Sequence, residues 1–62
     1  MTLDEARQNI GRGVVYTPGH GWPVEQGTIT GCSDTSVFVL YLGDMAPKGT
    51  RPEDLVFLAG SA

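Results

Sequence analysis

The stretch that most constrains the fold is residues 26–43, in which two β-strand patterns flank a short polar turn. Residues 28–30 alternate polar and apolar side chains, as a strand with one face in water does. Residues 31–36 (GCSDTS) are small or turn-forming. Residues 37–42 (VFVLYL) are rich in β-branched and aromatic side chains and form the most apolar run of the chain. The sequence therefore predicts a β-hairpin around which the core is built.

Length and cysteine content restrict the class of protein. The chain has 62 residues and is expected to form one domain over residues 1–62, which at this size buries only about 60% of its unfolded surface. The single cysteine, Cys32, cannot supply a disulfide framework. The first residues carry acids and no apolar signal segment, and the longest apolar run is far shorter than the roughly 20 residues of a membrane span. We therefore expect a soluble, cytoplasmic protein.

A short helix is predicted for residues 2–10. Thr2 and Glu5 have the spacing of a capping box, and acids in the first turn complement the helix dipole. Gly11 is a natural stop. A helix this short is marginal in water, so its apolar face must pack on the sheet. That face consists of Leu3, Ala6 and Ile10.

The remaining strands are short and separated by loops. Residues 13–16 form the first strand, followed by a long loop over 17–25 (TPGHGWPVE) that contains two glycines and two prolines. A second loop covers residues 43–49. Pro52 with the acids after it predicts a single helical turn, and residues 55–59 form the last strand.

This order of elements resembles the small SH3-like barrel over residues 12–59. More specifically, GVVYTPGHG, VFVLYLGD and TRPEDLVFL look like segments of short phage- or prophage-encoded proteins of this kind, a largely uncharacterised group. The resemblance implies an all-β, five-stranded SH3-like barrel with a short N-terminal helix and a one-turn 3-10 helix before the last strand. It also implies a bacterial or phage-infected host cell as the setting. Peptide-binding SH3 domains carry an acidic first loop and a tryptophan that opens the third strand. Here the loop has only Glu25 as an acid, and Trp22 lies inside it, so the resemblance does not extend to binding of proline-rich peptides.

Catalytic and metal-binding patterns are absent from the sequence. A metal site needs several ligands at suitable spacing, and the chain offers one histidine, His20, and one cysteine. Nothing in the spacing holds His20 near a serine or Cys32 as a base beside a nucleophile. The sequence also lacks a glycine-rich phosphate loop. We expect neither enzyme activity nor a cofactor or metal.

Aromatic residues are the best candidates for a recognition site, because their rings provide large contact area at low entropic cost. These candidates are Tyr16, His20, Trp22 and Tyr41. An alternative is that the two tyrosines line the barrel core and Trp22 closes its open end. We expect a non-catalytic protein-interaction module, encoded by a phage or prophage, that binds a host or virion protein through loop 16–25.

Nucleic-acid binding is a second hypothesis. It would use Arg12, Lys48 and Arg51 on the phosphates, with Tyr16 or Trp22 stacked on a base. The net charge of −3 disfavours it, because binding to phosphates normally requires a basic patch.

Self-assembly is a third hypothesis, since residues 37–42 are apolar on both faces of the predicted strand. We expect Val37 and Val39 inside the barrel, with Phe38 and Leu40 on the other face covered by Leu3 and Ile10. Uncovered, Phe38 and Leu40 would form an interface between copies or with another protein.

Overall fold

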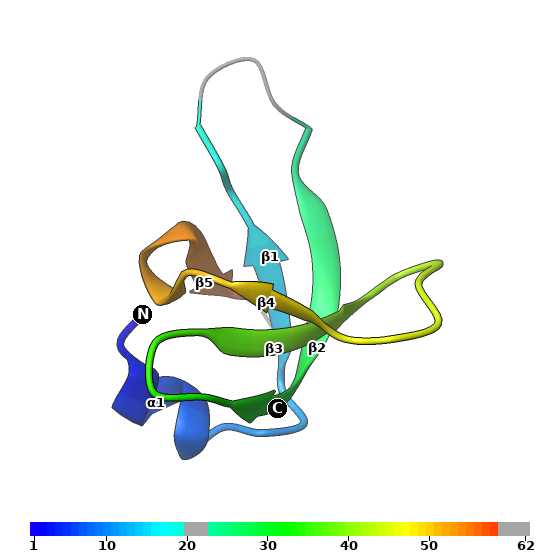
Figure 1. Cartoon of the computed structure of the whole chain (residues 1–62). Helices are drawn as coiled ribbons and strands as arrows, with labels where there is room; N and C mark the ends of the chain where they lie inside the picture. Colours follow the sequence, from blue (N-terminus) through cyan, green and yellow to red (C-terminus); the bar gives the residue numbers. More distant parts are fainter. Residues whose placement is uncertain (20–22, 59–62) are drawn as a thin grey trace.

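A five-stranded antiparallel sheet forms most of the computed structural model, which describes residues 1–19 and 23–58 (Figure 1). The strands are β1 (Gly13–Tyr16), β2 (Glu25–Cys32), β3 (Val37–Tyr41), β4 (Lys48–Thr50) and β5 (Leu55–Phe57). A helix, α1 (Leu3–Arg7), precedes the sheet, and a 3-10 turn, η1 (Pro52–Asp54), joins β4 to β5. The predicted all-β class, the number of strands and the turn before the last strand are confirmed. The loop expected over residues 43–49 ends earlier, because β4 begins at Lys48 and pairs with β3.

The strand order, β4-β3-β2-β1-β5, places β4 and β5 at opposite edges of the sheet. In a flat sheet, four inter-strand spacings would separate these edges by about 19 Å. The connection from Thr50 to Leu55 contains the three-residue turn η1 and spans only about 13 Å at the rise of a 3-10 turn and extended flanks. The sheet must therefore curl until its two edges approach each other, and η1 bridges them (Figure 1).

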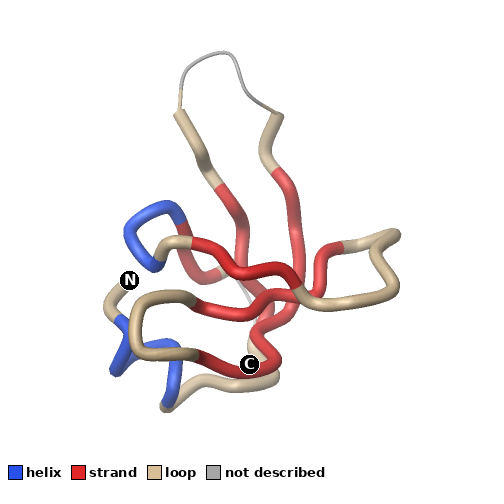
Figure 2. The backbone as a smooth tube through the Cα atoms, viewed as in Figure 1, coloured by secondary structure: helices blue, strands red, loops and turns tan. Residues whose placement is uncertain are grey.

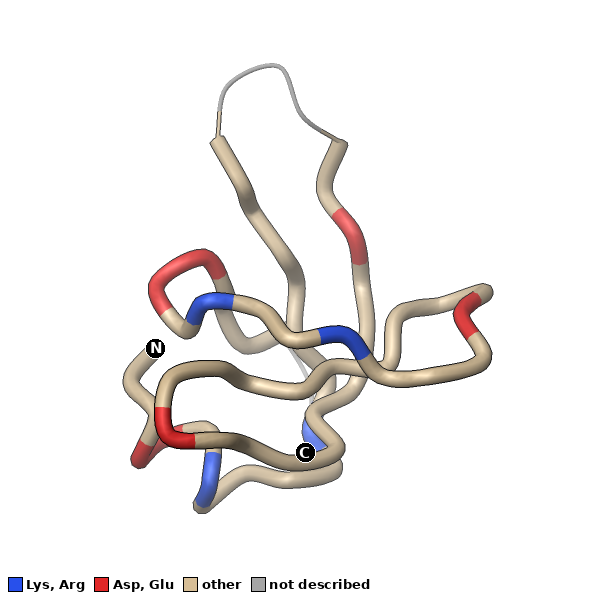
Figure 3. Tube along the Cα trace, viewed as in Figure 1, with Lys and Arg blue, Asp and Glu red and all other residues tan. Residues whose placement is uncertain are grey.

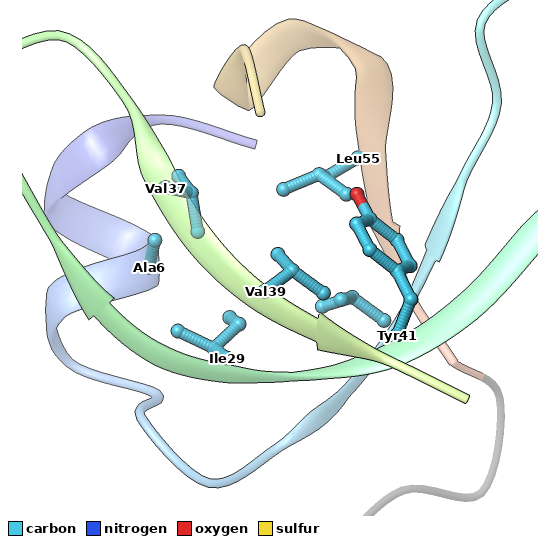
Figure 4. Packing of buried hydrophobic residues seen from close by; sticks show 7 residues of the cluster. Ala6, Ile29, Val37, Val39, Tyr41 and Leu55 are labelled. Carbon is cyan, nitrogen blue, oxygen red and sulfur yellow. The ribbon is translucent and has the colours of Figure 1, made fainter. Parts of the chain in front are cut away.

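The core lies on the inner face of the curled sheet. Along β3, buried and exposed residues alternate, with Val37, Val39 and Tyr41 buried. This confirms the prediction that Val37 and Val39 point inward. Figure 4 shows how the side chains converge from the helix and the strands. The buried apolar residues are Ala6, Val14, Ile29, Val37, Val39, Tyr41 and Leu55.

The N-terminal helix begins as predicted but is shorter than predicted. The Glu5 amide donates to Thr2 Oγ1 (3.1 Å) and the Thr2 amide donates to Glu5 Oε1 (2.8 Å), which completes the capping box. The helix ends at Arg7 rather than near residue 10. Beyond the helix, the Gly11 amide donates to the Ile29 carbonyl (2.8 Å). The chain therefore pairs with β2 here and does not continue as a helix.

The prediction that the helix covers Phe38 and Leu40 is wrong. Helix α1 packs on the inner side, where Ala6 is fully buried in the core, whereas Ile10 is 56% exposed. Phe38 and Leu40 point to the opposite face of the sheet and are 38% and 37% exposed. The reason is that a helix of five residues presents too little apolar surface to cover a strand, and its one alanine fits inside the curl.

Gly27 is a buried position on the inner face, where β2 lies close against β3. A Cβ atom there would lie 2.7 Å from the Leu40 carbonyl oxygen and 2.7 Å from Val39 Cγ1. The nearest obstruction is backbone, which cannot rotate away. Gly27 is therefore required where β2 bends beneath β3.

We predict that Gly27→Ala lowers the free energy of unfolding by about 1–3 kcal/mol through overpacking. Gly31→Ala is the matched control in the same strand, because nothing lies within 4 Å of its Cβ position. Urea unfolding of the two variants and the wild type would measure the difference. Equal stability of Gly27→Ala and the wild type would contradict the close approach.

Candidate functional site

The inner face of the sheet opens to solvent at the end of the core formed by Tyr16, and two adjoining hollows occupy this end. The first, of about 430 Å³, is lined by Tyr16, Pro18, Pro23, Glu25, Arg51 and Asp54. The second, of about 350 Å³, shares Tyr16, Glu25, Arg51 and Asp54 and continues over Tyr41, Lys48, Gly49 and Thr50. We call the two hollows together the β1–η1 groove. Figure 2 shows the base of the loop after β1 beside the η1 turn, which form two sides of this region.

Strand register explains why these side chains meet. Tyr16 pairs with Glu25 across β1 and β2, and Gly27 pairs with Tyr41 across β2 and β3. Residues two apart on a strand face the same side, so Glu25 shares the inner face with Gly27 and Ile29. The groove is therefore the continuation of the core surface, at the point where apolar side chains give way to polar ones.

Asp54 fastens the η1 side of the groove to the loop after β1. Its carbonyl accepts hydrogen bonds from the Thr17 amide (2.8 Å) and from Thr17 Oγ1 (3.2 Å). Its carboxylate accepts from Arg51 Nε (3.1 Å) and lies 3.0 Å from the second guanidinium nitrogen, NH2. This hydrogen bond and the charge of Asp54 raise the pKa of Arg51 above its ordinary value. Asp54 thus fixes both the loop base and the position of Arg51.

Two tyrosines form the aromatic floor of the groove. Their rings make an edge-to-face contact, with centroids 6.1 Å apart at an interplanar angle of 61°. Tyr41 is only 5% exposed, and its hydroxyl lies 2.6 Å from Thr50 Oγ1. Burial raises the pKa of Tyr41 above its ordinary value of 10.0, and the nearby charge of Glu25 raises it further. The hydroxyl pair is therefore neutral and held rigidly at physiological pH.

The structure brings together some of the residues that the sequence singled out. Tyr16, Tyr41, Lys48 and Arg51 all line the groove. Tyr41 is also a core residue, as the alternative interpretation had it. His20 and Trp22, the other two aromatic candidates, lie outside the described residues.

Arg12 is not among the groove residues. Its guanidinium lies 4.3 Å from the centroid of the Phe57 ring, and its NH1 group donates to Asn9 Oδ1 (3.2 Å). Lys48 pairs with Asp44 (3.3 Å), and Arg51 pairs with Asp54. The three cations considered for nucleic-acid contacts are therefore divided between the groove and the Phe57 region.

Six further groove residues were not among the sequence candidates. They are Pro18, Pro23, Glu25, Gly49, Thr50 and Asp54. Pro18 and Pro23 are visible in the sequence as loop residues and Asp54 as an acid of the helical turn, but none has a local signal for binding. Thr50 pairs with Val37 in the β3–β4 register, and its hydroxyl meets that of Tyr41 across the inner face of the sheet, which a linear sequence does not reveal.

Within residues 1–19 and 23–58, no group of three or more His, Cys, Asp or Glu side chains could hold a metal ion. The helices of this described part are all too short or too polar to cross a bilayer. Comparisons of the chain with protein-family models, with curated proteins and with solved structures find no match.

The hydroxyl pair gives a prediction on titration. In a Tyr16→Phe variant, Tyr41 is the only tyrosine, and its ionisation can be followed by absorbance at 295 nm. Because burial raises the pKa of Tyr41, the midpoint should lie at higher pH in the folded protein than in urea. An equal midpoint in the two states would contradict the burial of the hydroxyl.

The same shift sets the direction of the pH dependence of stability. The folded state holds the Tyr41 proton more tightly than the unfolded state. The contribution of this Tyr41 proton to the free energy of unfolding is therefore complete below pH about 10. It is lost as the pH rises through the pKa of Tyr41 in the folded state. Thermal unfolding midpoints measured up to pH 11 should fall less steeply for Tyr41→Phe than for the wild type.

Proposed function

We propose that the curled sheet is a small SH3-like barrel and that the protein is a non-catalytic protein-interaction module encoded by a phage or prophage. In this proposal it acts in the cytoplasm of the host cell, where it binds a host or virion protein through loop 16–25 and the β1–η1 groove. The strand order and the 3-10 turn between β4 and β5 support the barrel assignment.

The groove is the observation that carries the proposal. It combines an aromatic ring, two prolines and an arginine, and tyrosine and arginine are enriched among the residues that contribute most to recognition at protein interfaces. Its walls are held by the hydrogen bonds of Asp54 to Thr17 and Arg51, so little order must be imposed when a partner binds. Among its described lining residues there is no histidine, cysteine or serine to act as a base or nucleophile.

Nucleic-acid binding is the second candidate, because Lys48, Arg51 and Tyr16 line the same groove. Each of these cations already has an acidic neighbour: Asp44 for Lys48, and Glu53 and Asp54 for Arg51. A phosphate would have to replace these carboxylates beside the cations and would be repelled by their negative charge. We therefore rank protein binding first. Self-assembly through Phe38 and Leu40 remains a prediction for the exposed outer face.

A capture experiment tests the proposal. Tagged wild-type protein is incubated with bacterial host lysate, with and without nuclease, beside Tyr16→Leu and the control Leu42→Ala. Tyr16→Leu retains an apolar side chain against the core but removes the ring, whereas Leu42 is exposed and outside the groove. We expect a captured protein that resists nuclease, persists with Leu42→Ala and falls at least about fivefold with Tyr16→Leu, as loss of an interface aromatic would give.

Two outcomes would contradict the proposal. Equal capture by the wild type and Tyr16→Leu would exclude the groove, provided that thermal unfolding shows both proteins folded. Loss of the captured material on nuclease treatment would favour the nucleic-acid candidate.

A further inference from the structure

We infer that the β1–η1 groove contains a cation subsite, in which a lysine or arginine side chain of the partner lies between the Glu25 carboxylate, the Tyr41–Thr50 hydroxyl pair and the Tyr16 ring. This inference rests on the proposed function and specifies the chemistry of the partner segment. Four features of the groove support it: an acid without a partner among the described residues, the acidic surroundings, a buried hydroxyl pair and the Tyr16 ring.

Glu25 is the acid without a partner. Its register position faces inward beside Tyr16, where a curled sheet would ordinarily place an apolar side chain. No ion pair or hydrogen bond joins its carboxylate to another residue in the described ranges 1–19 and 23–58, whereas Lys48, Arg51 and Arg7 all have acidic partners there. The charge in the groove that still lacks a counter-charge is therefore negative.

The surroundings of the groove are also acidic. Its two lining cations, Lys48 and Arg51, are accompanied by four acids: Glu25 and Asp54 in the lining, and Asp44 and Glu53 as ion-pair partners of the cations. Figure 3 shows acids on β2, at η1 and in the loop before β4, around the two basic positions at the start of β4 and just after its end. Four acids against two bases leave a local charge of −2, and the whole chain has −3. This field attracts a cationic segment and repels an anionic one.

The hydroxyl pair provides further ligands for a cation. Tyr41 and Thr50 are 5% and 8% exposed, and their hydroxyl oxygens lie 2.6 Å apart. One hydroxyl donates to the other, so lone pairs on both oxygens and one further O–H remain without a partner among the described residues. At the Tyr41 hydroxyl, the negative charge of Glu25 has a larger effect than the positive charge of Lys48. The oxygens are therefore suited to accept hydrogen bonds from an ammonium or guanidinium group.

Tyr16 adds an aromatic surface to the same place. Its ring contacts that of Tyr41, and its strand partner is Glu25. A cation over a tyrosine ring gains electrostatic attraction from the ring face. The second hollow, of about 350 Å³, is large enough for the end of one such side chain and within the usual range of ligand sites.

An mRNA-displayed library of random dodecapeptides tests the inference with no assumption about the natural partner. The library is selected in parallel against the wild type, Glu25→Gln and Glu25→Lys. Glu25 is exposed, so these substitutions leave the fold intact, and thermal unfolding checks that they do. We expect the wild type to enrich peptides with lysine or arginine, Glu25→Gln to lose that preference and Glu25→Lys to enrich aspartate or glutamate.

A matched peptide pair then measures the subsite itself. The best recovered peptide is compared with a version in which its cationic residue is replaced by norleucine. On the wild type we expect about threefold to tenfold weaker binding of the norleucine peptide, the range for a partly exposed ion pair with hydrogen bonds. On Glu25→Gln, the two peptides should bind almost equally.

The outcomes separate this inference from the proposed function. Peptides that bind the groove without a preference for cations, and with affinities unchanged by Glu25→Gln, would overturn the cation subsite alone. A wild-type protein that enriches no peptide at all would count against both the subsite and the proposed protein-binding function.

Discussion

The short connection between the two edge strands determines the shape of this protein. Only the η1 turn and one residue on its N-terminal side separate β4 from β5, so the sheet cannot remain flat. Curling buries one face of β3 completely, at Val37 and Val39, and requires a glycine at residue 27 where β2 passes beneath it. The Met1 nitrogen donates to the carbonyls of Pro52 and Leu55, both at 3.1 Å, so the N-terminal segment also holds η1 in place.

The same constraint generates the groove. A curled sheet of short strands has too few apolar residues to fill its inner face from end to end, and the helix α1 fills one end with Ala6. At the other end the inward positions are occupied by Tyr16, Glu25 and Tyr41, and the surface becomes polar and accessible. The site and the core are therefore parts of one inner face, on which apolar side chains give way to polar ones along the strands. For this reason Tyr41 belongs to the core and also to the groove, and the sequence candidates for the core and for the site overlapped.

Sequence patterns that act over a few neighbouring residues were sufficient to predict most of the fold. The capping box of Thr2 and Glu5, the alternation in β3 and the proline at the start of η1 each act within a few residues. The end of the helix was not predictable in this way, because Gly11 and Arg12 pair with Ile29, a contact set by the tertiary structure. The groove was only partly predictable for the same reason. Tyr16 and Arg51 stand out by residue type, but the meeting of Tyr41 with Thr50 and of Asp54 with Thr17 depends on strand register and on the curl.

We propose that a partner binds where the curled inner face opens, and not on the apolar outer face of β3. Amide chemical-shift mapping tests this most directly, with isotope-labelled protein titrated with the best peptide recovered from the random library. The perturbed amides should cluster at residues 16, 17, 24, 25, 48–51, 53 and 54. Perturbations concentrated at residues 38–42 and at Val56, whose side chain is exposed on β5, would contradict it and identify the outer face as the binding surface.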